Sequence, residues 1–442
     1  MSAATGADRL EIAPAAALVG EIAVPGDKSI SHRSLLIGAV CDGATEVTGF
    51  GANADTLATL AAVESLGARV ERLDAGATHL RIHGRGLRGL QAPEGVIDVQ
   101  NAGTLMRLLP GLLVGQSGSF TLDGDDSIRR RPVDRIAMPL KLMGAVLGDS
   151  DGRPPLHIDG GNELQPIGYE LPVASAQVKS CILLAGLYAV TGPTTVIEPV
   201  PTRDHTERLL RAAGARIAKG PRTVSVWPVE RLELGAVDVP GDISSAAPFL
   251  VAATLLAESR LFVRGMSTNP TRTGLLTVLE RMGARINLFN RRTTSGGEPI
   301  ADVEVHPAEL VATEIEAEIV PALIDELPLL ALAATMARGR TVVRGAGELR
   351  VKESNRLETV AELLRAIGGH VRATDDGWEI QGVPARPEGG RVDAHGDHRI
   401  GMLGAVAGLV SRNGVRVEGA SSIGVSYPGF AAELERLAVR PW

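Results

Sequence analysis

The chain repeats one local pattern six times, at intervals of about 75 residues, and this repetition constrains the fold more than any other feature. In each repeat an apolar, helix-like run is followed by a strand-like run that begins with glycine or serine. The residues that begin these strands are Gly43, Gly118, Gly192, Ser259, Gly339 and Gly414. In the first five repeats a second helix-like run ends at a further glycine, at Gly67, Gly144, Gly214, Gly283 and Gly368. The sixth copy of this second run spans residues 430–437.

Helices that end at glycine and lead into Val- and Ile-rich strands predict an α/β fold in which the helices feed a sheet. Each repeat then holds two helices and three to four short strands, roughly in the order βαβαββ. Because 442 residues exceed what one hydrophobic core usually supports, we expect two domains of three repeats each.

The tripeptide Pro-Gly-Asp occurs at residues 25–27 and again at residues 240–242, each time just before the first helix of a repeat. Two identical turn signals about half a chain apart predict paired crossings between domains, and a chance match of three residues is the alternative. We therefore place one domain at residues 26–239 and the other at residues 1–25 plus 240–442, with hinges near Pro25 and Pro240.

The composition is that of an ordinary globular protein, with 44% hydrophobic and 22% charged residues. A net charge of −7 and an aromatic content of 3% argue against nucleic-acid binding and base stacking. Charged residues interrupt the N-terminal stretch and no run of 18 apolar residues is present, so neither a signal peptide nor a membrane span is expected. Cys41 and Cys181 lie in apolar helix-like runs, which argues against a disulfide framework or a zinc site. We expect a cytoplasmic protein.

Counting back from the glycines places the start of each helix, and polar side chains gather there. The first helices are expected to begin near Ser29, Thr104, Gln177, Ser245, Asp325 and Ile400, and the second helices near Asp55, Pro132, Thr202, Thr271 and Arg356. Ordinary N-capping accounts for four polar residues at these starts, namely Asp55, Thr104, Ser245 and Asp397.

Cations at the helix starts need another explanation, because Lys or Arg in the first turn opposes the helix dipole. They are Lys28, Arg33, Arg131, Lys179, Arg203, Arg272, Lys352, Arg356 and Arg399. An anion bound at the helix start removes the conflict, since the backbone amides, the dipole and the cation then all point toward it. In a chain of net charge −7, this pattern predicts small anionic substrates that carry phosphate or carboxylate groups.

Two carboxylates stand among these cations as candidate proton-transfer groups. Asp325 lies in an apolar stretch, where a carboxylate makes little sense as a surface group. Glu353 lies between Lys352 and Arg356, so a salt-bridged helix start is the alternative for it. His398 is interpreted with equal weight as a capping or core histidine and as a functional one.

Five motifs lie in order along the chain: Pro25-Gly-Asp-Lys-Ser-Ile-Ser-His-Arg33, Asn101-Ala-Gly-Thr-Leu-Met-Arg107, Arg131-Pro132, Leu349-Arg-Val-Lys-Glu-Ser-Asn-Arg356 and Asp397-His-Arg399. Together they resemble the 5-enolpyruvylshikimate-3-phosphate synthase family over essentially the whole chain. Four shorter patterns resemble the class II branch of that family: Gly26-Asp27-Lys28, Ser175-Ala176-Gln177-Val178-Lys179, Arg203-Asp204-His205-Thr206-Glu207 and Asn269-Pro270-Thr271-Arg272.

The resemblance implies a two-domain enolpyruvyl transferase fold, an inside-out α/β barrel with three βαβαββ repeats in each domain, which closes on its substrates. It implies transfer of the enolpyruvyl group of phosphoenolpyruvate to the 5-hydroxyl of shikimate 3-phosphate, with release of phosphate and with no cofactor or metal. We expect a monomer that acts on these two small molecules and binds neither nucleic acid nor membrane.

By similarity to the family, shikimate 3-phosphate is held by Ser29, Arg33, Ser175, Ala176, Gln177, Arg203 and Lys352. Phosphoenolpyruvate is held by Lys28, Gly103, Arg131, Gln177, Arg356 and Arg399. Asp325 takes the 5-hydroxyl proton, and Glu353 donates a proton near the methylene carbon. A carboxylate pair among many cations suits a reaction that joins two highly charged anions.

Two positions depart from the family pattern. The commonest branch has a lysine in the turn before a Phe-Pro or Tyr-Pro pair, where this chain has Val425, so one phosphate contact is missing, as expected for class II. Class II members known for herbicide tolerance have alanine where this chain has Gly103. The family resemblance places glyphosate at this position, and the glycine leaves room for it.

Three alternatives stay open. The sister transferase that acts on UDP-N-acetylglucosamine shares the architecture, but typically has Asn after the first-hinge Lys and a reactive Cys in the second repeat. This chain has Ser29 there and no cysteine between Cys41 and Cys181. RNA 3′-phosphate cyclases also use βαβαββ units, but they need ATP and a nucleophilic His. A non-catalytic phosphate-binding scaffold is disfavoured by Asp325 and Glu353 among so many cations.

Overall fold

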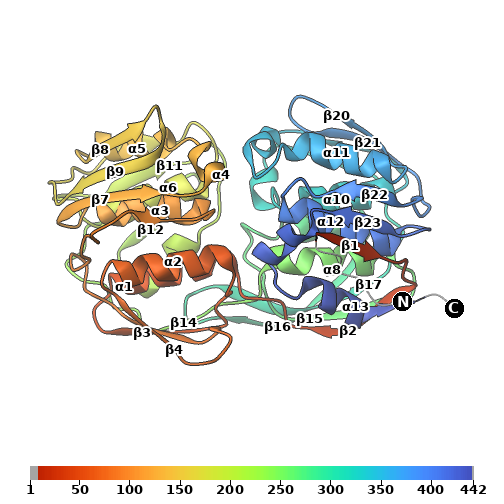
Figure 1. Ribbon diagram of the computed structural model, residues 1–442, viewed down its shortest axis with the longest axis horizontal. Helices are drawn as coiled ribbons and strands as arrows, with labels where there is room; N and C mark the ends of the chain where they lie inside the picture. The colour runs from red at the N-terminus through yellow and green to blue at the C-terminus, as the bar shows by residue number, and fades with distance from the viewer. Residues whose placement is uncertain (1–7, 441–442) are drawn as a thin grey trace. The chain divides into compact units, whose positions relative to one another are not determined.

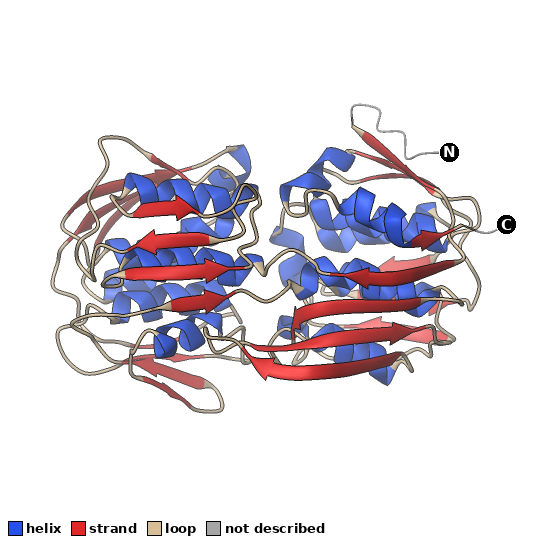
Figure 2. Ribbon diagram, turned by 90° about the horizontal axis from the view of Figure 1, so that it is seen from below, coloured by secondary structure: helices blue, strands red, loops and turns tan. Residues whose placement is uncertain are grey.

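The structure is a computed structural model that describes residues 8–440, and these residues form two compact units. Unit 1 consists of residues 8–25, 241–292 and 299–440, and unit 2 consists of Gly26–Pro240 and Thr293–Glu298. Each unit has three sheets, and its helices pack against its own sheets (Figures 1 and 2). This arrangement confirms the predicted α/β class.

The three sheets of unit 2 share one pairing pattern. In each, the first strand pairs in parallel with the second, and the other pairs are antiparallel. In sheet order the strands are β14 (Ala236–Asp238), β3 (Ala44–Thr48), β5 (Leu80–His83) and β4 (Arg69–Arg72); β6 (Ile97–Asp98), β7 (Gly118–Asp123), β9 (Arg153–Gly160) and β8 (Val146–Ser150); and β10 (Gly168–Glu170), β11 (Thr194–Ile197), β13 (Thr223–Val226) and β12 (Ile217–Lys219).

The sheets of unit 1 again contain one parallel pair each: β2 with β15, β18 with β19, and β22 with β23. In sheet order the strands are β16 (Arg285–Thr293), β17 (Pro299–His306), β15 (Arg260–Ser267), β2 (Ala17–Ile22) and β24 (Ala438–Val439); β18 (Glu314–Ile315), β19 (Gly339–Val343), β21 (Trp378–Gly382) and β20 (His370–Ala373); and β1 (Arg9–Ile12), β23 (Val415–Glu418) and β22 (Gly390–Asp393).

The helices follow the predicted repeat, with two in each. The helices of unit 2 are α1 (Lys28–Ala39), α2 (Ala54–Ser65), α3 (Gly103–Leu113), the short α4 (Asp126–Arg129), α5 (Asp134–Leu142), α6 (Ala176–Gly186) and α7 (His205–Ala212). Those of unit 1 are α8 (Ile243–Leu255), α9 (Gly274–Arg281), α10 (Leu327–Thr335), α11 (Arg356–Ala366), α12 (His398–Val410) and α13 (Phe430–Leu437), with 3₁₀ turns η1 (Val320–Ala322), η2 (Gly347–Val351) and η3 (Ala420–Val425).

The first helix of each repeat forms the interior of its unit. In α8, for example, every residue from Ile243 to Thr254 is buried, and α10 is buried along its whole length. Helices that are apolar on all sides belong in a core, so the sheets lie around them. The second helices, such as α5 and α9, bury one side and expose the other. The starts of the buried first helices are therefore held in fixed positions by packing.

The two Pro-Gly-Asp segments mark the boundary between the units. Within unit 2 the amide of Asp27 donates to the carbonyl of Pro240 at 2.8 Å, and within unit 1 the amide of Asp242 donates to the carbonyl of Pro25 at 2.8 Å. In unit 2, β14 ends two residues before Pro240 and pairs with β3, and in unit 1, β2 ends three residues before Pro25 and pairs with β15.

Residues 293–298 differ from the expected domain bounds, because they pack with unit 2 although their neighbours in sequence belong to unit 1. Ser295 donates to the carboxylate of Asp238 at 3.1 Å, and the carbonyl of Gly297 accepts from Arg208 at 2.7 Å. Glu298 is fully buried and lies 2.8 Å from His205 Nδ1. These polar contacts hold the turn between β16 and β17 on unit 2.

Cys41 and Cys181 are both buried free thiols. Cys181 lies in α6, whereas Cys41 lies two residues beyond the end of α1. Burial raises the pKa of each thiol to about 12, so neither is a ready nucleophile. Within residues 8–440, none of the helices has the length and apolar character needed to cross a bilayer.

Candidate functional site

In unit 2, most of the predicted substrate-binding residues stand at the starts of α1, α3 and α6. Asp27 caps α1 by accepting a hydrogen bond from the amide of Ile30 at 3.0 Å. Lys28, the first residue of α1, forms an ion pair of 2.9 Å with Asp55 in the first turn of α2. This ion pair holds the ammonium group in place, and the Lys28 side chain is 24% exposed.

Arg33 lies one turn along α1, next to Ser29, and is buried. Its guanidinium donates to the Ser29 carbonyl at 2.8 Å, to Ser180 Oγ at 2.9 Å and to Thr206 Oγ1 at 2.6 Å. Burial lowers the pKa of Arg33 to about 10, while the nearby Glu207 acts in the opposite direction. Arg33 thus ties α1 to α6 and α7, and its direct contact with substrate stays a prediction.

Lys179 was expected among the cations that face an anion, and this was wrong. Its side chain is fully buried and forms ion pairs of 3.0 Å with Glu198 and 2.8 Å with Glu207. Lys179 lies one turn inside α6, on a side of the helix that packs into the unit. Two protein carboxylates therefore take the place of the expected ligand.

The start of α3 brings Gly103 against two arginines. The N-cap residue of α3, Ala102, has no side chain that can cap the helix. A Cβ atom at Gly103 would stand 2.8 Å from Nη1 of Arg131 and 3.3 Å from Nη1 of Arg107. The start of α3 therefore has no side-chain cap and faces two guanidinium groups. Such an arrangement is suited to binding an anion. Arg107 was in a recognised motif but not among the predicted binding residues; its spacing of one helical turn from Gly103 was the available signal.

Gln177 links the starts of α3 and α6. Its Oε1 accepts from Arg107 at 3.0 Å and its Nε2 donates to Thr104 Oγ1 at 3.0 Å. Ser175 caps α6, and Ala176 is the first residue of that helix. These contacts keep the start of α3 next to the start of α6 within unit 2. Four predicted binding residues lie at these two starts, namely Gly103, Ser175, Ala176 and Gln177.

The remaining predicted residues of unit 2 lie in loops. Arg131 follows the short helix α4, and its Nη2 lies 3.2 Å from Ser127 Oγ and 3.4 Å from Asn101 Oδ1. Arg203 is half-buried and lies two residues before α7. Both therefore stand near helix starts, as the sequence predicts.

Three of the four predicted N-caps are wrong, because α2, α3 and α8 begin one or two residues earlier than counting from the glycines suggests. Asp397 caps α12 as predicted, accepting from the amide of Arg399 at 2.9 Å. The residues that do not cap their helices are Asp55, Thr104 and Ser245. The caps are instead Asn53 for α2 and Asp242 for α8, and α3 has no side-chain cap.

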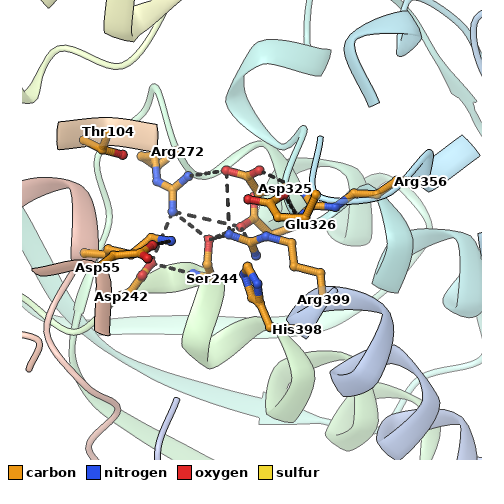
Figure 3. A network of polar contacts seen from close by, with 12 residues as sticks. Asp55, Thr104, Asp242, Ser244, Arg272, Asp325, Glu326, Arg356, His398 and Arg399 are labelled. Atoms are coloured by element: carbon orange, nitrogen blue, oxygen red, sulfur yellow. Dashed lines mark hydrogen bonds and ion pairs between the residues drawn. The ribbon is translucent and has the colours of Figure 1, made fainter. Parts of the chain in front are cut away.

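In unit 1, Asp325 stands among three arginines (Figure 3). It lies between η1 and α10, two residues before the helix that was expected to begin at it. Its Oδ1 lies 3.5 Å from Arg356 Nη1, and its Oδ2 lies 3.8 Å from Arg272 Nη1 and 3.7 Å from Arg399 Nη2. The Asp325 side chain is 14% exposed, so a partly accessible carboxylate is surrounded by positive charge.

Arg356 joins Asp325 to two further carboxylates. Its Nη2 lies 2.6 Å from Glu353 Oε2, and its Nε lies 2.8 Å from Asp397 Oδ2. Burial acts to raise the pKa of Asp397, but the charge and hydrogen bonds of Arg356 outweigh it, so the net pKa lies below the usual value. The salt-bridged helix start that was the alternative for Glu353 is thus present. Its side chain is nevertheless 28% exposed, which leaves it accessible for proton transfer.

Ser244, Glu326 and Asp242 complete this cluster, and none of them was among the residues selected from the sequence. Arg272 donates to Ser244 Oγ at 2.8 Å and to Asp242 Oδ1 at 3.2 Å, while Ser244 donates to Glu326 Oε1. The available signal for Glu326 was its place directly after Asp325 in the same apolar stretch. For Asp242 it was the second Pro-Gly-Asp turn.

Lys352 and His398 flank the cluster. Lys352 follows η2 and is half-buried. His398 is the first residue of α12, is largely buried, and its Nδ1 lies 4.0 Å from Asp397. This position fits both interpretations of His398, which stay open.

Comparison of the fold with solved structures defines the class of protein first. The enolpyruvyl transferase NikO from Streptomyces tendae superimposes with a TM-score of 0.79 at 20% identity, covering 97% of each chain. At that identity the likeness concerns the fold alone. It confirms the enolpyruvyl transferase fold that the family resemblance implied.

Closer relatives define the family. The chain is similar to EPSP synthase from Acinetobacter baumannii, with a TM-score of 0.88 and 42% identity over 98% of this chain and 99% of that one. It is 50% identical to a 3-phosphoshikimate 1-carboxyvinyltransferase of Acidithiobacillus ferrooxidans over 96% of each chain, and 46% identical to that of Methylococcus capsulatus over 96% and 95%. Residues 12–434 match the family described as EPSP synthase (3-phosphoshikimate 1-carboxyvinyltransferase). The chain belongs to the EPSP synthase family, as the sequence motifs predicted.

Proposed function

We propose that this protein transfers the enolpyruvyl group of phosphoenolpyruvate to the 5-hydroxyl of shikimate 3-phosphate and releases phosphate, a step of aromatic amino acid biosynthesis. Family membership over residues 12–434 supports the reaction. The observation that carries the chemistry is the position of Asp325, a partly accessible carboxylate within 4 Å of three arginines. A proton acceptor surrounded by cations suits a reaction between two anions.

We assign the residues in each unit separately. In unit 2, shikimate 3-phosphate is bound by Ser29, Arg33, Ser175, Ala176, Gln177 and Arg203, and phosphoenolpyruvate by Lys28, Gly103, Arg131 and Gln177. The partly exposed Lys28 side chain and the Arg131 guanidinium beside the start of α3 support these roles. Because amides at a helix start and a guanidinium attract the same anion, Gly103 and Arg131 act together.

In unit 1, Asp325 accepts the 5-hydroxyl proton and Glu353 delivers a proton to the methylene carbon. Arg356 and Arg399 bind phosphoenolpyruvate, and Lys352 binds shikimate 3-phosphate. The contacts of Arg356 with both Asp325 and Glu353 support this division, since one cation then holds the acceptor and the donor at a fixed distance. We expect the enzyme to act in the cytoplasm as a monomer without binding nucleic acid, which its net charge of −7 favours.

The test is an incubation with phosphoenolpyruvate and one acceptor at a time, with phosphate release as the readout. Shikimate 3-phosphate should support release, and UDP-N-acetylglucosamine should not. Mass spectrometry of the acceptor should show the added enolpyruvyl group. Release with UDP-N-acetylglucosamine alone would assign the protein to the sister transferase instead, and the absence of release with both acceptors would contradict the proposed reaction.

A further inference from the structure

Glu326 is a fully buried carboxylate that does not perform the helix capping its position allows. It is the N-cap residue of α10, yet its side chain makes no capping hydrogen bond. Its exposure is 0%, and within the described residues Oε2 has no hydrogen-bond partner. A charge removed from water in this way costs free energy unless opposite charges lie close to it. Two arginines supply them: Oε1 lies 3.8 Å from Arg399 Nη1 and 4.0 Å from Arg272 Nη2.

The hydroxyl of Ser244 connects these three side chains, and its hydrogen-bonding capacity is fully used. It donates to Glu326 Oε1, and it accepts from Arg272 Nη2 at 2.8 Å and from Arg399 Nη2 at 3.3 Å. A serine hydroxyl has one hydrogen to donate and two lone pairs. Because the hydroxyl donates its hydrogen to Glu326, both lone pairs are available to the arginines. Figure 3 shows these side chains together.

The two arginines held in this way are two of the three that approach Asp325. Arg272 Nη1 and Arg399 Nη2 lie 3.8 Å and 3.7 Å from Asp325 Oδ2, which is longer than a direct hydrogen bond. Glu326 thus competes with Asp325 for the same two cations. Without the negative charge of Glu326, the Arg399 guanidinium would move toward Asp325 and leave the position in which it binds substrate.

We propose that Glu326 is a positioning residue that acts through Ser244 to hold the guanidinium groups of Arg272 and Arg399 in place, so that Arg399 is oriented for phosphoenolpyruvate. This inference rests on the proposed function, in which Arg399 binds that substrate. Glu326 itself touches no reacting atom. Its effect falls on the binding of phosphoenolpyruvate, because the charge of bound substrate can restore the orientation of Arg399 before the chemical step.

The first test is Glu326→Gln, which keeps the size of the side chain and an acceptor for Ser244 but removes the charge. We expect the KM for phosphoenolpyruvate to rise at least tenfold, kcat to change less than threefold, and the KM for shikimate 3-phosphate to stay within twofold. The matched control is Glu304→Gln. Glu304 is a largely buried carboxylate of β17 in the same unit and pairs with Arg260 at 3.3 Å, outside the cluster. The control should leave all three constants within twofold.

The second test is a double-mutant cycle with Ser244→Ala. If Glu326 acts through the hydroxyl, each single variant should raise the KM for phosphoenolpyruvate, and the double variant should be no worse than the stronger single one. Additive effects would overturn the relay through Ser244. An unchanged KM for phosphoenolpyruvate in Glu326→Gln would overturn the positioning role. This holds even if the thermal midpoint falls, because a residue that only stabilises the fold changes the amount of folded enzyme and not its affinity for substrate. Inactivity of the wild type with both substrates would instead overturn the proposed function. Failure of the positioning role and failure of the proposed reaction therefore give different results.

Discussion

Gly103 lies directly against the guanidinium of Arg131, with a Cβ atom at residue 103 falling 2.8 Å from Nη1 of that arginine. Real Cβ atoms do not approach other atoms so closely, and the obstacle is the far end of a flexible side chain. An alanine at this position therefore has to push Arg131 aside. The glycine thus preserves both the open start of α3 and the position of a cation beside it.

The first prediction concerns Gly103→Ala. The displaced Arg131 should raise the KM for phosphoenolpyruvate by about tenfold, because one charge-assisted contact is weakened. Glyphosate, which by family resemblance occupies the same position and is longer than the substrate, should lose more, since the methyl group also takes space from it. The measurement is the ratio of the inhibition constant to the KM in both proteins.

Gly168→Ala is the matched control for this prediction, because a Cβ atom at Gly168 in β10 meets nothing within 4 Å. It should leave both constants unchanged. Equal losses of substrate and inhibitor affinity in Gly103→Ala would show that displacement of Arg131 is the whole effect and that the methyl group does not discriminate.

The second prediction concerns proton transfer. Asp325→Asn and Glu353→Gln should each lower kcat by at least about 100-fold, since general acid–base groups typically contribute that much. Shikimate 3-phosphate should still bind within about tenfold of the wild-type affinity, because most of the residues assigned to it lie in unit 2. Rapid-quench turnover and calorimetric binding measure the two quantities. Turnover close to wild type in either variant would remove that residue from the mechanism.

The glycine pattern predicted the helices well, because a helix that ends in a left-handed residue needs glycine at that position. Gly67, Gly144, Gly214 and Gly283 all have positive φ angles between 90° and 102°. The same pattern could not predict that β14 pairs with β3, or that residues 293–298 pack with unit 2. Those features depend on contacts between segments far apart in sequence, which a local pattern does not record.

For the site, the sequence indicated which residues are charged but not which way each one faces. Lys179 and Lys28 both stand at the start of a buried helix, yet the first is enclosed by Glu198 and Glu207 and the second is 24% exposed. Glu326 was overlooked beside Asp325 for the same reason. Only the packing of α10 against its neighbours decides which of two adjacent carboxylates is buried.

The third prediction tests the buried ion pairs of Lys179. Lys179→Met removes the cation from between Glu198 and Glu207 and leaves two buried carboxylates without it. Loss of one partner from a buried ion pair typically destabilises a protein by about 3–5 kcal/mol. Urea unfolding followed by circular dichroism measures the loss. Lys141→Met is the control, because Lys141 is 48% exposed and pairs with Asp149 at 3.5 Å, so it should cost less than about 1 kcal/mol. Similar losses in both variants would contradict the importance of burial.

The last prediction concerns His32, which is fully buried in α1. Its Nδ1 lies 2.6 Å from Thr59 Oγ1, and within the described residues Nε2 has no hydrogen-bond partner. Burial lowers the pKa of His32 to about 3, although Asp55 acts to raise it. In the unfolded chain a histidine titrates near its ordinary value of 6.5.

The sign of the pH dependence follows from these two values. Between them the unfolded chain binds a proton that folded His32 does not, so stability is fully present above pH 6.5 and is lost as the pH falls toward 3. From pH 7 to pH 5 this single group should remove about 2 kcal/mol from the free energy of unfolding. His32→Asn should lack that part of the decrease, whereas His370→Asn, at an exposed position in β20, should retain it. The same decrease in wild type and His32→Asn would mean that His32 accepts a proton without unfolding, and that its burial does not hold it neutral.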